Sequence, residues 1–501
     1  MTLLSIGYLL ETPGCSFPLY NPYHWSVSYR WERVNATNVT YEEICSARNR
    51  TVILQEGGKF SLDSIGLLLA YNATVQGTKC YYHVVSRDET AYIPDTKPIL
   101  GPARSLPFGF SGPDAESLFK RYSFDTFPLL WNTFRLEGYT TLFLEEMPYY
   151  GLFTYPNYLG FNRPPTDYYP EPVLRMMDEK GGNDRFCVGS RLKTKVLIRY
   201  LADVLKMNVN RSMFSYVWLS DVTHNNLKGI KVIDQPLEEF FRQLSDAGIF
   251  ENTAVLFLSD HGNRIGPYRM SEIGRHEDKT PFCFLILPRR FLQEYPEAVV
   301  QLEVNQRRLV THYDLHATLL SLSKLPAFNP EPTNKGLNVF TAIPPERTCA
   351  DAFIAPEFCA CTGTTGETPD PGVMLSFSRY SVSYINALAM LHFPGKCIEW
   401  QLESVDEASA LGGRVAGKLL LRVQLTLTPT AHFEVYGTLR NASLDDKHVD
   451  FVQRLDKYSN GTTCLPNSAW QKVCMCKPEL LNISSTFQSP DSASLDDMAG
   501  S

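Results

Sequence analysis

The chain has 501 residues, of which 44% are hydrophobic, and a formal net charge of -7. This length exceeds what one compact core takes up, so we expect two or three domains. The acidic balance, together with the lack of a basic stripe interleaved with aromatic residues, argues against a nucleic-acid-binding protein. No stretch of the sequence is long and apolar enough to predict a transmembrane segment in this chain.

Residues 1–90 predict a small, β-rich region tied by disulfides. They contain three cysteines and strand-like runs such as residues 79–85, with little helical periodicity. The first residues make a poor signal peptide, because they have no basic segment and only a brief apolar stretch. We therefore expect the native amino terminus to be missing from this version of the chain.

Residues 91–345 predict an α/β core in which a mostly parallel sheet is sandwiched by helices. Helices are predicted at residues 125–136, 192–205 and 313–322, and in a segment opened by Asp234 and Pro236 and closed by Gly248. Strands are predicted at residues 140–144, 213–219, 254–258 and 282–287. The alternation of strands and helices indicates parallel strands covered on both faces. The core is incomplete at about residues 91–115, where prolines interrupt every element.

Residues 346–478 predict a cysteine-rich α+β domain, and residues 479–501 predict a disordered tail. Seven of the twelve cysteines fall between Cys349 and Cys476, and their close pairs have the spacing C-x-C. Zinc knuckles need pairs spaced C-x₂-C, so disulfides are the favoured interpretation. Within this domain, residues 414–427 alternate like one half-buried strand.

Eight Asn-x-Ser/Thr triplets agree with passage through the secretory pathway, where disulfides also form. The triplets begin at Asn35, Asn38, Asn49, Asn72, Asn210, Asn441, Asn460 and Asn482. We therefore expect a secreted or extracellular glycoprotein.

The strongest chemical signal is the pair Asp260 and His261, which follows the apolar run at residues 254–258 after a single serine. In open α/β sheets, ligands bind at the carboxyl ends of the strands. An adjacent Asp and His offer one oxygen and one nitrogen ligand, which suits zinc or a similar divalent ion. Gly262 would let the backbone turn away sharply. The alternative interpretation is an N-capping Asp with an incidental His.

A second predicted strand ends in Asp221 and His224, and His276 follows on a loop rich in Gly and Arg. Because the ends of parallel strands lie on one edge, these candidate ligands could meet there. Two metal ions with arginines nearby suit hydrolysis of a phosphate or sulfate ester: the metals activate the nucleophile and stabilise the leaving oxygen, and arginine holds the anion. The candidate anion-binding residues are Arg264, Arg269 and Arg275.

These candidates also have structural alternatives. Asp221 and His224 could be turn and capping residues, and His276 could be an incidental loop histidine. The three arginines could simply be solvated. Glu145 and Glu146 also stand at a strand end and could contribute a carboxylate to the site, but we expect them to be exposed on the surface.

The candidate site lies within a wider set of motifs. Residues 259–269 read SDHGNRIGPYR and residues 274–281 read GRHEDKTP. Further blocks lie at residues 127–131, 138–140, 145–146, 160–161, 165–169, 305–309, 313–319, 345–349, 453–455 and 464–476. Together these blocks cover most of the chain. They resemble the sulfatase-like, alkaline-phosphatase-fold family of secreted or membrane-tethered animal proteins known as domain of unknown function 229.

This resemblance implies divalent metals bound by Asp260, His261 and His224. The sequence departs from the family pattern at Asn225, where an acid usually stands, and at His276, where an apolar residue usually stands. Families of this fold also place an Asp and a nucleophilic Ser or Thr just after the first core strand. That block is missing between about residues 90 and 110, so no catalytic residue is assigned.

Two functions remain open from the sequence. The first is a metal-dependent hydrolase or transferase that acts on an anionic phosphate or sulfate ester in the secretory or extracellular space, with zinc as the expected cofactor. The second is a non-catalytic secreted glycoprotein that keeps the fold and has a binding or structural role. The strand end at Asp260 favours the first, and the missing nucleophile favours the second.

Overall fold

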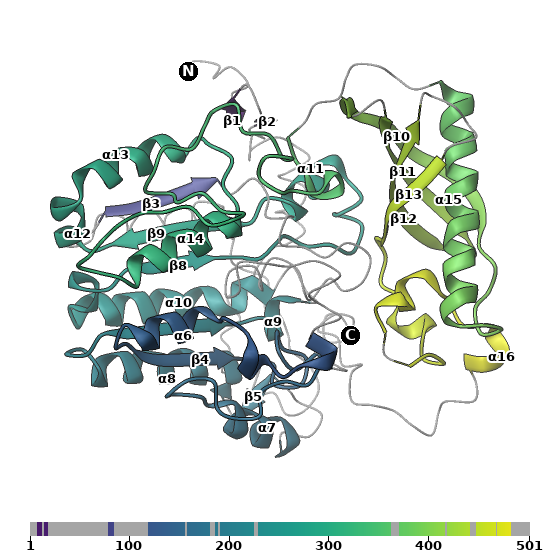
Figure 1. The fold of residues 1–501 in the computed structure, drawn as a ribbon. Coiled ribbons are helices and arrows are strands. Elements are labelled where there is room, and N and C mark those ends of the chain that lie inside the picture. Colours follow the sequence, from purple (N-terminus) through teal and green to yellow (C-terminus); the bar gives the residue numbers. More distant parts are fainter. Residues whose placement is uncertain are drawn as a thin grey trace, which may run out of the picture.

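The computed structural model describes residues 8–12, 15–18, 79–84, 119–155, 158–180, 186–188, 191–224, 229–361, 370–415, 418–440, 447–466 and 468–481. These residues form an α/β unit and, beside it, an antiparallel C-terminal sheet backed by a long helix (Figure 1). The prediction for residues 91–115 lies outside the described residues, as do most of those for residues 1–90 and for the tail at 479–501. The first residues of that predicted tail, 479–481, are helical instead of disordered.

The α/β unit confirms the predicted fold class. Its strands are β3 (Lys79–Val84), β4 (Thr140–Glu145), β7 (Met213–Trp218), β8 (Val255–Leu258) and β9 (Phe282–Leu287). Its helices are α6 (Leu130–Leu136), α7 (Glu171–Lys180), α8 (Lys193–Met207), α9 (Asp221–His224), α10 (Gly229–Asp246), α11 (Glu272–Asp278), α12 (Arg289–Glu294), α13 (Pro296–Asn305) and α14 (His312–Leu322). Shorter elements are η4 (Phe124–Thr126), η5 (Ile249–Glu251), and the strand pairs β1 (Tyr8–Thr12) with β2 (Cys15–Pro18) and β5 (Cys187–Val188) with β6 (Arg191–Leu192).

The core strands form two hydrogen-bonded groups among the described residues. β4 and β7 pair in parallel, as predicted, while β3, β9 and β8 form a second sheet in that order. In this second sheet β9 runs antiparallel to both neighbours, which the sequence pattern did not predict. The reason is that the segment after β8 forms only the short α11 and returns into β9 from the same sheet edge, without a crossover helix.

The strand predicted at residues 79–85 belongs to this second sheet. β3 pairs with β9 along its whole length, from Lys79 opposite Leu287 to Val84 opposite Phe282. The last strand of the predicted N-terminal region is therefore an edge strand of the α/β unit.

Alternate residues of β4 face two different apolar clusters, as the period of a strand requires. Phe143 packs on one side with Trp131 of α6, at 5.1 Å between ring centroids, and Leu142 and Leu144 pack on the other side with α8 and α10. The strand is buried on both faces because helices cover both, which explains its continuous apolar sequence.

Two predicted helix starts differ from the structure. α6 begins at Leu130 instead of residue 125, because Pro128 restricts its neighbour and lacks a donor; residues 124–126 form η4. α10 begins earlier than predicted and contains Pro236 inside. Its first turns bury Ile233 against Val222, and this packing outweighs the local cost of the proline.

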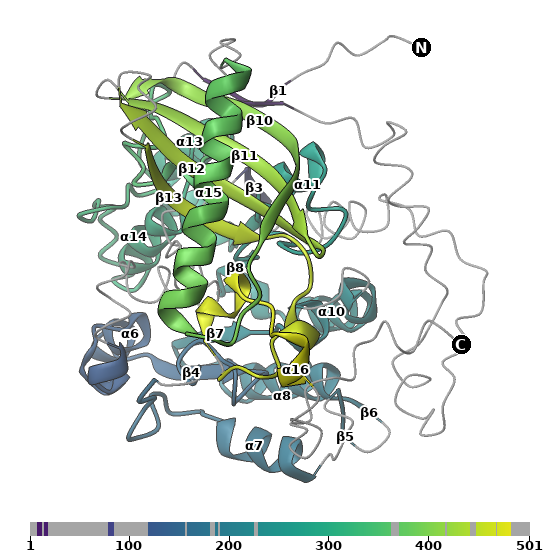
Figure 2. The ribbon, with the colours of Figure 1, turned by 90° about the vertical axis from the view of Figure 1, so that its right-hand side faces the viewer.

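The C-terminal sheet consists of β10 (Gln401–Val415), β11 (Lys418–Thr428), β12 (Ala431–Arg440) and β13 (Lys447–Arg454), paired antiparallel in chain order. α15 (Pro371–His392) runs along one face of the sheet (Figure 2) and packs Phe377 and Ile385 against it. Leu421, Val423 and Leu425 supply the apolar face of β11. The predicted strand at residues 414–427 is in fact divided, because Val415 ends β10 and Lys418 begins β11.

Disulfides tie this part of the chain, as predicted. The bonds join Cys349 to Cys359, Cys397 to Cys474 and Cys464 to Cys476. The remaining elements here are η6 (Pro356–Phe358), η7 (Ser459–Gly461), η8 (Ala469–Val473) and α16 (Pro478–Leu481).

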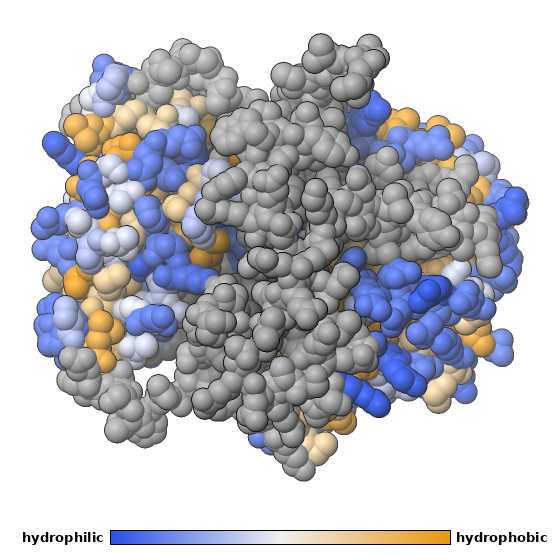
Figure 3. Space-filling view, turned by 180° about the vertical axis from the view of Figure 1, so that it is seen from behind, coloured by the Kyte–Doolittle hydropathy of each residue, from blue (hydrophilic) through white to orange (hydrophobic). Residues whose placement is uncertain are grey.

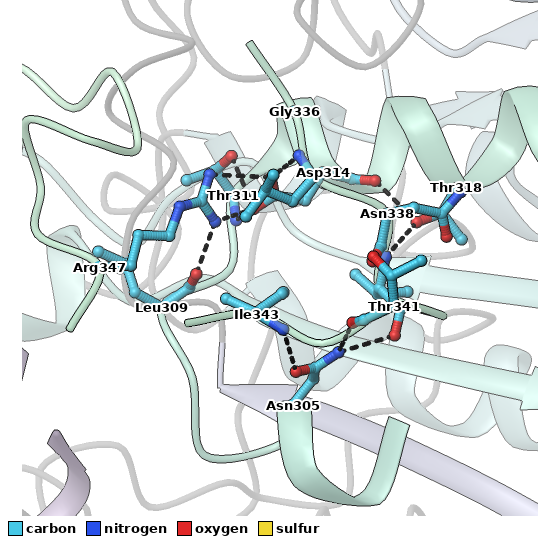
Figure 4. A network of polar contacts seen from close by, with 12 residues as sticks. Asn305, Leu309, Thr311, Asp314, Thr318, Gly336, Asn338, Thr341, Ile343 and Arg347 are labelled. Atoms are coloured by element: carbon cyan, nitrogen blue, oxygen red, sulfur yellow. Dashed lines mark hydrogen bonds and ion pairs between the residues drawn. The ribbon is translucent and has the colours of Figure 1, made fainter. Parts of the chain in front are cut away.

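A buried polar network fixes the segment that leaves α14 (Figure 4). Arg347 binds Asp314 through both of its terminal nitrogens, at 2.7 and 3.0 Å. Asn305 accepts from the backbone N–H of Ile343 at 3.1 Å, and Asn338 donates to Ser321 at 2.7 Å. This network joins three of the sequence blocks that carry the family resemblance.

The visible surface is mixed in polarity. Seen from behind, the described parts show hydrophilic side chains with hydrophobic ones interspersed (Figure 3). Within the described residues, none of the helices combines the length and the apolar composition needed to cross a membrane.

Candidate site at the strand ends

Asp260 and His261 lie at the carboxyl end of β8, as predicted, and both side chains are partly exposed. His261 Nδ1 lies 2.6 Å from the carbonyl oxygen of Gly262. A carbonyl can only accept, so Nδ1 carries the proton in this contact. His261 Nε2 then faces Asp260 Oδ2 at 3.2 Å. Because a neutral Nε2 and a carboxylate oxygen are both electron-rich, this contact is favourable only with a proton or a metal ion between the two atoms.

The donor pair fits two positions of a zinc site. Zinc binds imidazole nitrogen and carboxylate oxygen at about 2.0–2.2 Å, so two ligands of one tetrahedral ion stand roughly 3.3 Å apart. The distance from His261 Nε2 to Asp260 Oδ2 is 3.2 Å. The hydrogen bond from Nδ1 to a backbone carbonyl is also the usual orienting contact of a metal-binding histidine. The pair therefore fits a divalent ion, with positions left for further ligands.

Gly262 fixes the direction in which the chain leaves this pair. Its N–H donates to the carbonyl oxygen of Asp278 at 2.9 Å. A Cβ atom at Gly262 would lie 2.1 Å from the carbonyl oxygen of Glu277, so any other residue would push the two segments apart. The predicted sharp turn is thus a close backbone approach between the strand end and α11.

A buried charged cluster lies at the ends of β4 and β7. Glu146 has no exposed surface, and its Oε2 accepts from the backbone N–H groups of Ser220 and Asp221 at 2.9 and 2.8 Å. Its other oxygen accepts from the hydroxyl of Thr194. Asp221 in turn pairs with Lys193 Nζ at 2.7 Å. The expectation that Glu145 and Glu146 are exposed is wrong, because the strand end carries both into this buried edge.

In this cluster the one ammonium group of Lys193 lies among the carboxylates of Asp178, Asp221 and Glu146. Burial raises the pKa of Glu146, and the negative charge of Asp221 raises it further. Burial opposes the charge of Lys193, but Asp221 and Asp178 outweigh it and raise the pKa of the lysine. Lys193 Nζ contacts both carboxylates, at 2.7 and 2.9 Å. The ammonium group thus serves as the cation between two carboxylates.

Among the described residues, neither His224 nor His276 forms a group of three close ligand atoms with Asp260 and His261. His224 is exposed at the last residue of α9, and His276 is buried in α11 with Nε2 3.3 Å from Arg275 Nη2. Among the described residues, the one set of three or more His, Cys, Asp or Glu ligand atoms within 4.8 Å of one another is Cys349, Cys359 and Cys361. A disulfide joins the first two of these sulfurs, so this set is not a metal centre.

The three predicted anion-binding arginines differ in position. Arg264 and Arg275 are partly exposed. Arg269 has no exposed surface, and its guanidinium pairs with Asp278 at 2.7 Å and with Glu434 of β12 at 2.6 Å. These two carboxylates engage Nε and Nη2 of a guanidinium that has no exposed surface, so Arg269 connects two parts of the protein.

Sequence reasoning did not find Lys193, Thr194 or Glu434. Lys193 and Thr194 open an amphipathic helix, where polar residues normally face water, and nothing local marks them as buried. Glu434 lies in a strand far from the motifs. The one available signal was Glu146, a carboxylate directly after an apolar strand.

The family profile for DUF229, described as a protein of unknown function, matches residues 103–406. The chain belongs to this DUF229 family. No curated protein matches the chain. Solved structures with similarity include the lipoteichoic acid synthase LtaP from Listeria monocytogenes, at 15% identity and a TM-score of 0.27, covering 44% of this chain and 59% of LtaP. Another is a protein of the alkaline phosphatase superfamily from Vibrio parahaemolyticus, at 11% identity and a TM-score of 0.32, covering 83% of this chain and 80% of that protein. The DUF229 chain therefore spans less than two thirds of the length of LtaP.

Proposed function

We propose that this DUF229 protein is an alkaline-phosphatase-like and sulfatase-like hydrolase or transferase of phosphate or sulfate esters. It works in the secretory pathway or outside the cell. It holds a divalent ion at Asp260 and His261, and zinc is the expected ion. The attacking group is not assigned, because the block expected to carry it is missing from the sequence. The three disulfides support an oxidising compartment.

The contact between His261 Nε2 and Asp260 Oδ2, at 3.2 Å, is the observation that carries this proposal. Two electron-rich ligand atoms converge at a strand end, and the carbonyl of Gly262 orients the imidazole for binding through Nε2. A divalent ion supplies Lewis acidity toward an ester oxygen when it is bound. Arg264 and Arg275, on the same loop and partly exposed, would hold the anionic group of the substrate.

A second candidate, a non-catalytic secreted glycoprotein with a binding or structural role, is favoured by a different observation. Asp221, the carboxylate predicted as a further metal ligand, is paired with the buried ammonium of Lys193. A lysine in this position neutralises the strand end without a metal ion. A protein with a binding or structural role, which needs a stable fold but no catalysis, would retain this ion pair between Asp221 and Lys193.

Metal content decides between the two candidates. Zinc would be measured by mass spectrometry in the purified full-length protein and in the double variant Asp260→Ala/His261→Ala. A matched control is His448→Ala/Asp450→Ala, which removes another His–Asp contact, 2.7 Å between Nδ1 and Oδ1, on the exposed side of β13. We expect near-stoichiometric zinc in the wild type and in the control, and loss of zinc in the Asp260/His261 variant.

Hydrolysis of aryl phosphates and aryl sulfates would then be assayed on the same three proteins. Zinc-dependent turnover that is lost only in the Asp260/His261 variant supports the first candidate. A wild-type protein that binds zinc, manganese and magnesium no better than the Asp260/His261 variant would overturn it and favour the second.

A further inference from the structure

The loop between β8 and β9, which carries Asp260 and His261, rests on the C-terminal sheet. The N–H of Gly266 donates to the carbonyl oxygen of Leu455 at 2.6 Å, and the side chain of Gln453 donates to the carbonyl oxygen of Arg264 at 3.3 Å. Figure 1 shows α11, which lies in this loop, between the α/β unit and the sheet. The loop that carries the candidate pair is therefore in contact with the C-terminal sheet at Arg264 and Gly266.

A short series of contacts leads from the site to β12. The first is the hydrogen bond from the N–H of Gly262 to the carbonyl of Asp278. The second joins the carboxylate of Asp278 to Arg269 Nε at 2.7 Å. The third joins Arg269 Nη2 to Glu434 Oε2 at 2.6 Å. Glu434 is thus three contacts from the residue next to His261, although it is far away in the sequence.

The two ion pairs of this series are buried and directional. Arg269 and Glu434 have no exposed surface, and Asp278 is also buried. The planar guanidinium presents its donors in a fixed fork, so the positions of the two carboxylates determine its orientation. Arg422 holds Glu434 from the other side, Nε to Oε1 at 2.6 Å, so the glutamate cannot turn without breaking a second ion pair.

We infer that Glu434 is a positioning residue for Asp260 and His261: acting through Arg269 and Asp278, it sets where α11 stands and so where the strand end points. The inference rests on the proposed metal site, and it adds that the C-terminal sheet is needed for the geometry of that site. It also gives Arg269 a role, which is to connect the site loop to the sheet.

The test compares Glu434→Gln with Glu407→Gln in the full-length protein. Glu407 pairs with Arg422 at 2.7 Å in the same network but does not touch Arg269, and its side chain is 42% exposed. Loss of a direct hydrogen-bond partner of a metal ligand typically costs 10- to 100-fold in affinity. Glu434 acts through Arg269 and Asp278, so we expect a smaller fall in zinc affinity in Glu434→Gln, of several-fold up to about tenfold. In Glu407→Gln it should change less than about twofold. Calorimetry gives the affinity, and the visible absorption of bound cobalt reports the ligand geometry.

A second readout does not need the metal. Hydrogen exchange of the Gly262 amide should speed up in Glu434→Gln and stay unchanged in Glu407→Gln, because only the first variant loosens the position of Asp278. If Glu434→Gln does not fold, Arg269→Lys replaces it, since lysine keeps the charge but cannot bind both carboxylates as a fork.

The outcomes separate this inference from the proposed function. Unchanged zinc affinity and unchanged Gly262 exchange in a folded Glu434→Gln or Arg269→Lys protein would overturn the inference, even if the wild type binds zinc. Faster exchange in a protein that binds no metal would overturn the proposed function but support the positioning role of Glu434.

Discussion

Two fully buried glutamates show how differently the two parts of this protein handle charge. Glu146, at the end of β4 in the α/β unit, accepts three hydrogen bonds, and burial raises its pKa. Glu434, in β12 of the C-terminal sheet, is equally buried, but its pKa lies well below the usual range. Burial acts in the same direction on both, and the charges of Arg269 and Arg422 reverse its effect on Glu434.

In both glutamates burial raises the pKa, and only at Glu434 do nearby positive charges outweigh it. In the C-terminal sheet, Glu434 is held between Arg422 of β11 and Arg269 of the loop between β8 and β9. The edge of the α/β unit has one ammonium, Lys193, for Asp178 and Asp221, with Glu146 beside them. The second arrangement has fewer positive charges for its carboxylates than the first, and in it the pKa of Glu146 is raised.

The largest expected effect follows from Glu434→Ala. Removing this carboxylate leaves Arg269 and Arg422 buried without their shared partner, which costs about 3–5 kcal/mol of unfolding free energy. Denaturant unfolding of the full-length protein measures the loss. A decrease below about 1 kcal/mol would show that Glu434 is not held as an ion pair.

Lys193→Met is expected to cost about 3 kcal/mol, at the lower end of the range for a broken buried pair. Asp221 loses its buried partner, whereas Asp178 is partly exposed and regains water. The control is Lys195→Met on the same helix, whose ammonium is partly exposed and 3.5 Å from Glu239. It should change the unfolding free energy by less than about 1 kcal/mol. Equal losses in the two variants would contradict the buried-pair interpretation.

Glu146→Gln is expected to change stability by less than about 1 kcal/mol at neutral pH, unlike any change at Glu434. Glutamine keeps an oxygen for the N–H groups of Ser220 and Asp221 and carries no charge to be desolvated. The same denaturant titration tests this expectation. A loss as large as that of Glu434→Ala would remove the distinction between the two regions.

The pH dependence provides the finest comparison. Glu146 has a raised pKa in the folded protein, so its contribution to stability falls as pH rises above 4.5 through the folded pKa. Glu434 has a lowered pKa, so its contribution is complete above 4.5 and is lost as pH falls through the folded pKa. Melting temperatures should be measured on both sides of pH 4.5. The melting temperature of Glu146→Gln, relative to that of the wild type, should increase as pH rises. A constant difference between the two proteins would contradict the raised pKa of Glu146.

The local sequence predicted most of the elements that carry the site. Apolar runs predicted β4, β7 and β8. The helical spacing of apolar residues, together with helix-ending residues, predicted α8 and α14. Asp260 and His261 stood out because charged side chains at the end of an apolar run are costly unless something uses them. These features depend on residues close together in the sequence, so pattern and propensity were enough to find them.

Other features depended on contacts between distant segments. The direction of β9, the membership of β3 in the core sheet and the 22-residue helix α15 could not be predicted. α15 escaped prediction because its apolar residues are not confined to one stripe, so it has no clear helical period. Register and strand direction are set by which surfaces the chain brings together, and local sequence does not contain that information.

The sequence by itself determined that an acidic and imidazole-bearing strand end exists in this DUF229 protein, since Asp260 and His261 follow an apolar strand after a single serine. The tertiary structure alone decided the roles of the surrounding charges. It paired Asp221 with Lys193 and placed Arg269 between Asp278 and Glu434. The physical reason is that the energy of a buried charge depends on the partners that folding places within a few ångströms of it, and these partners lie up to 165 residues away in the chain.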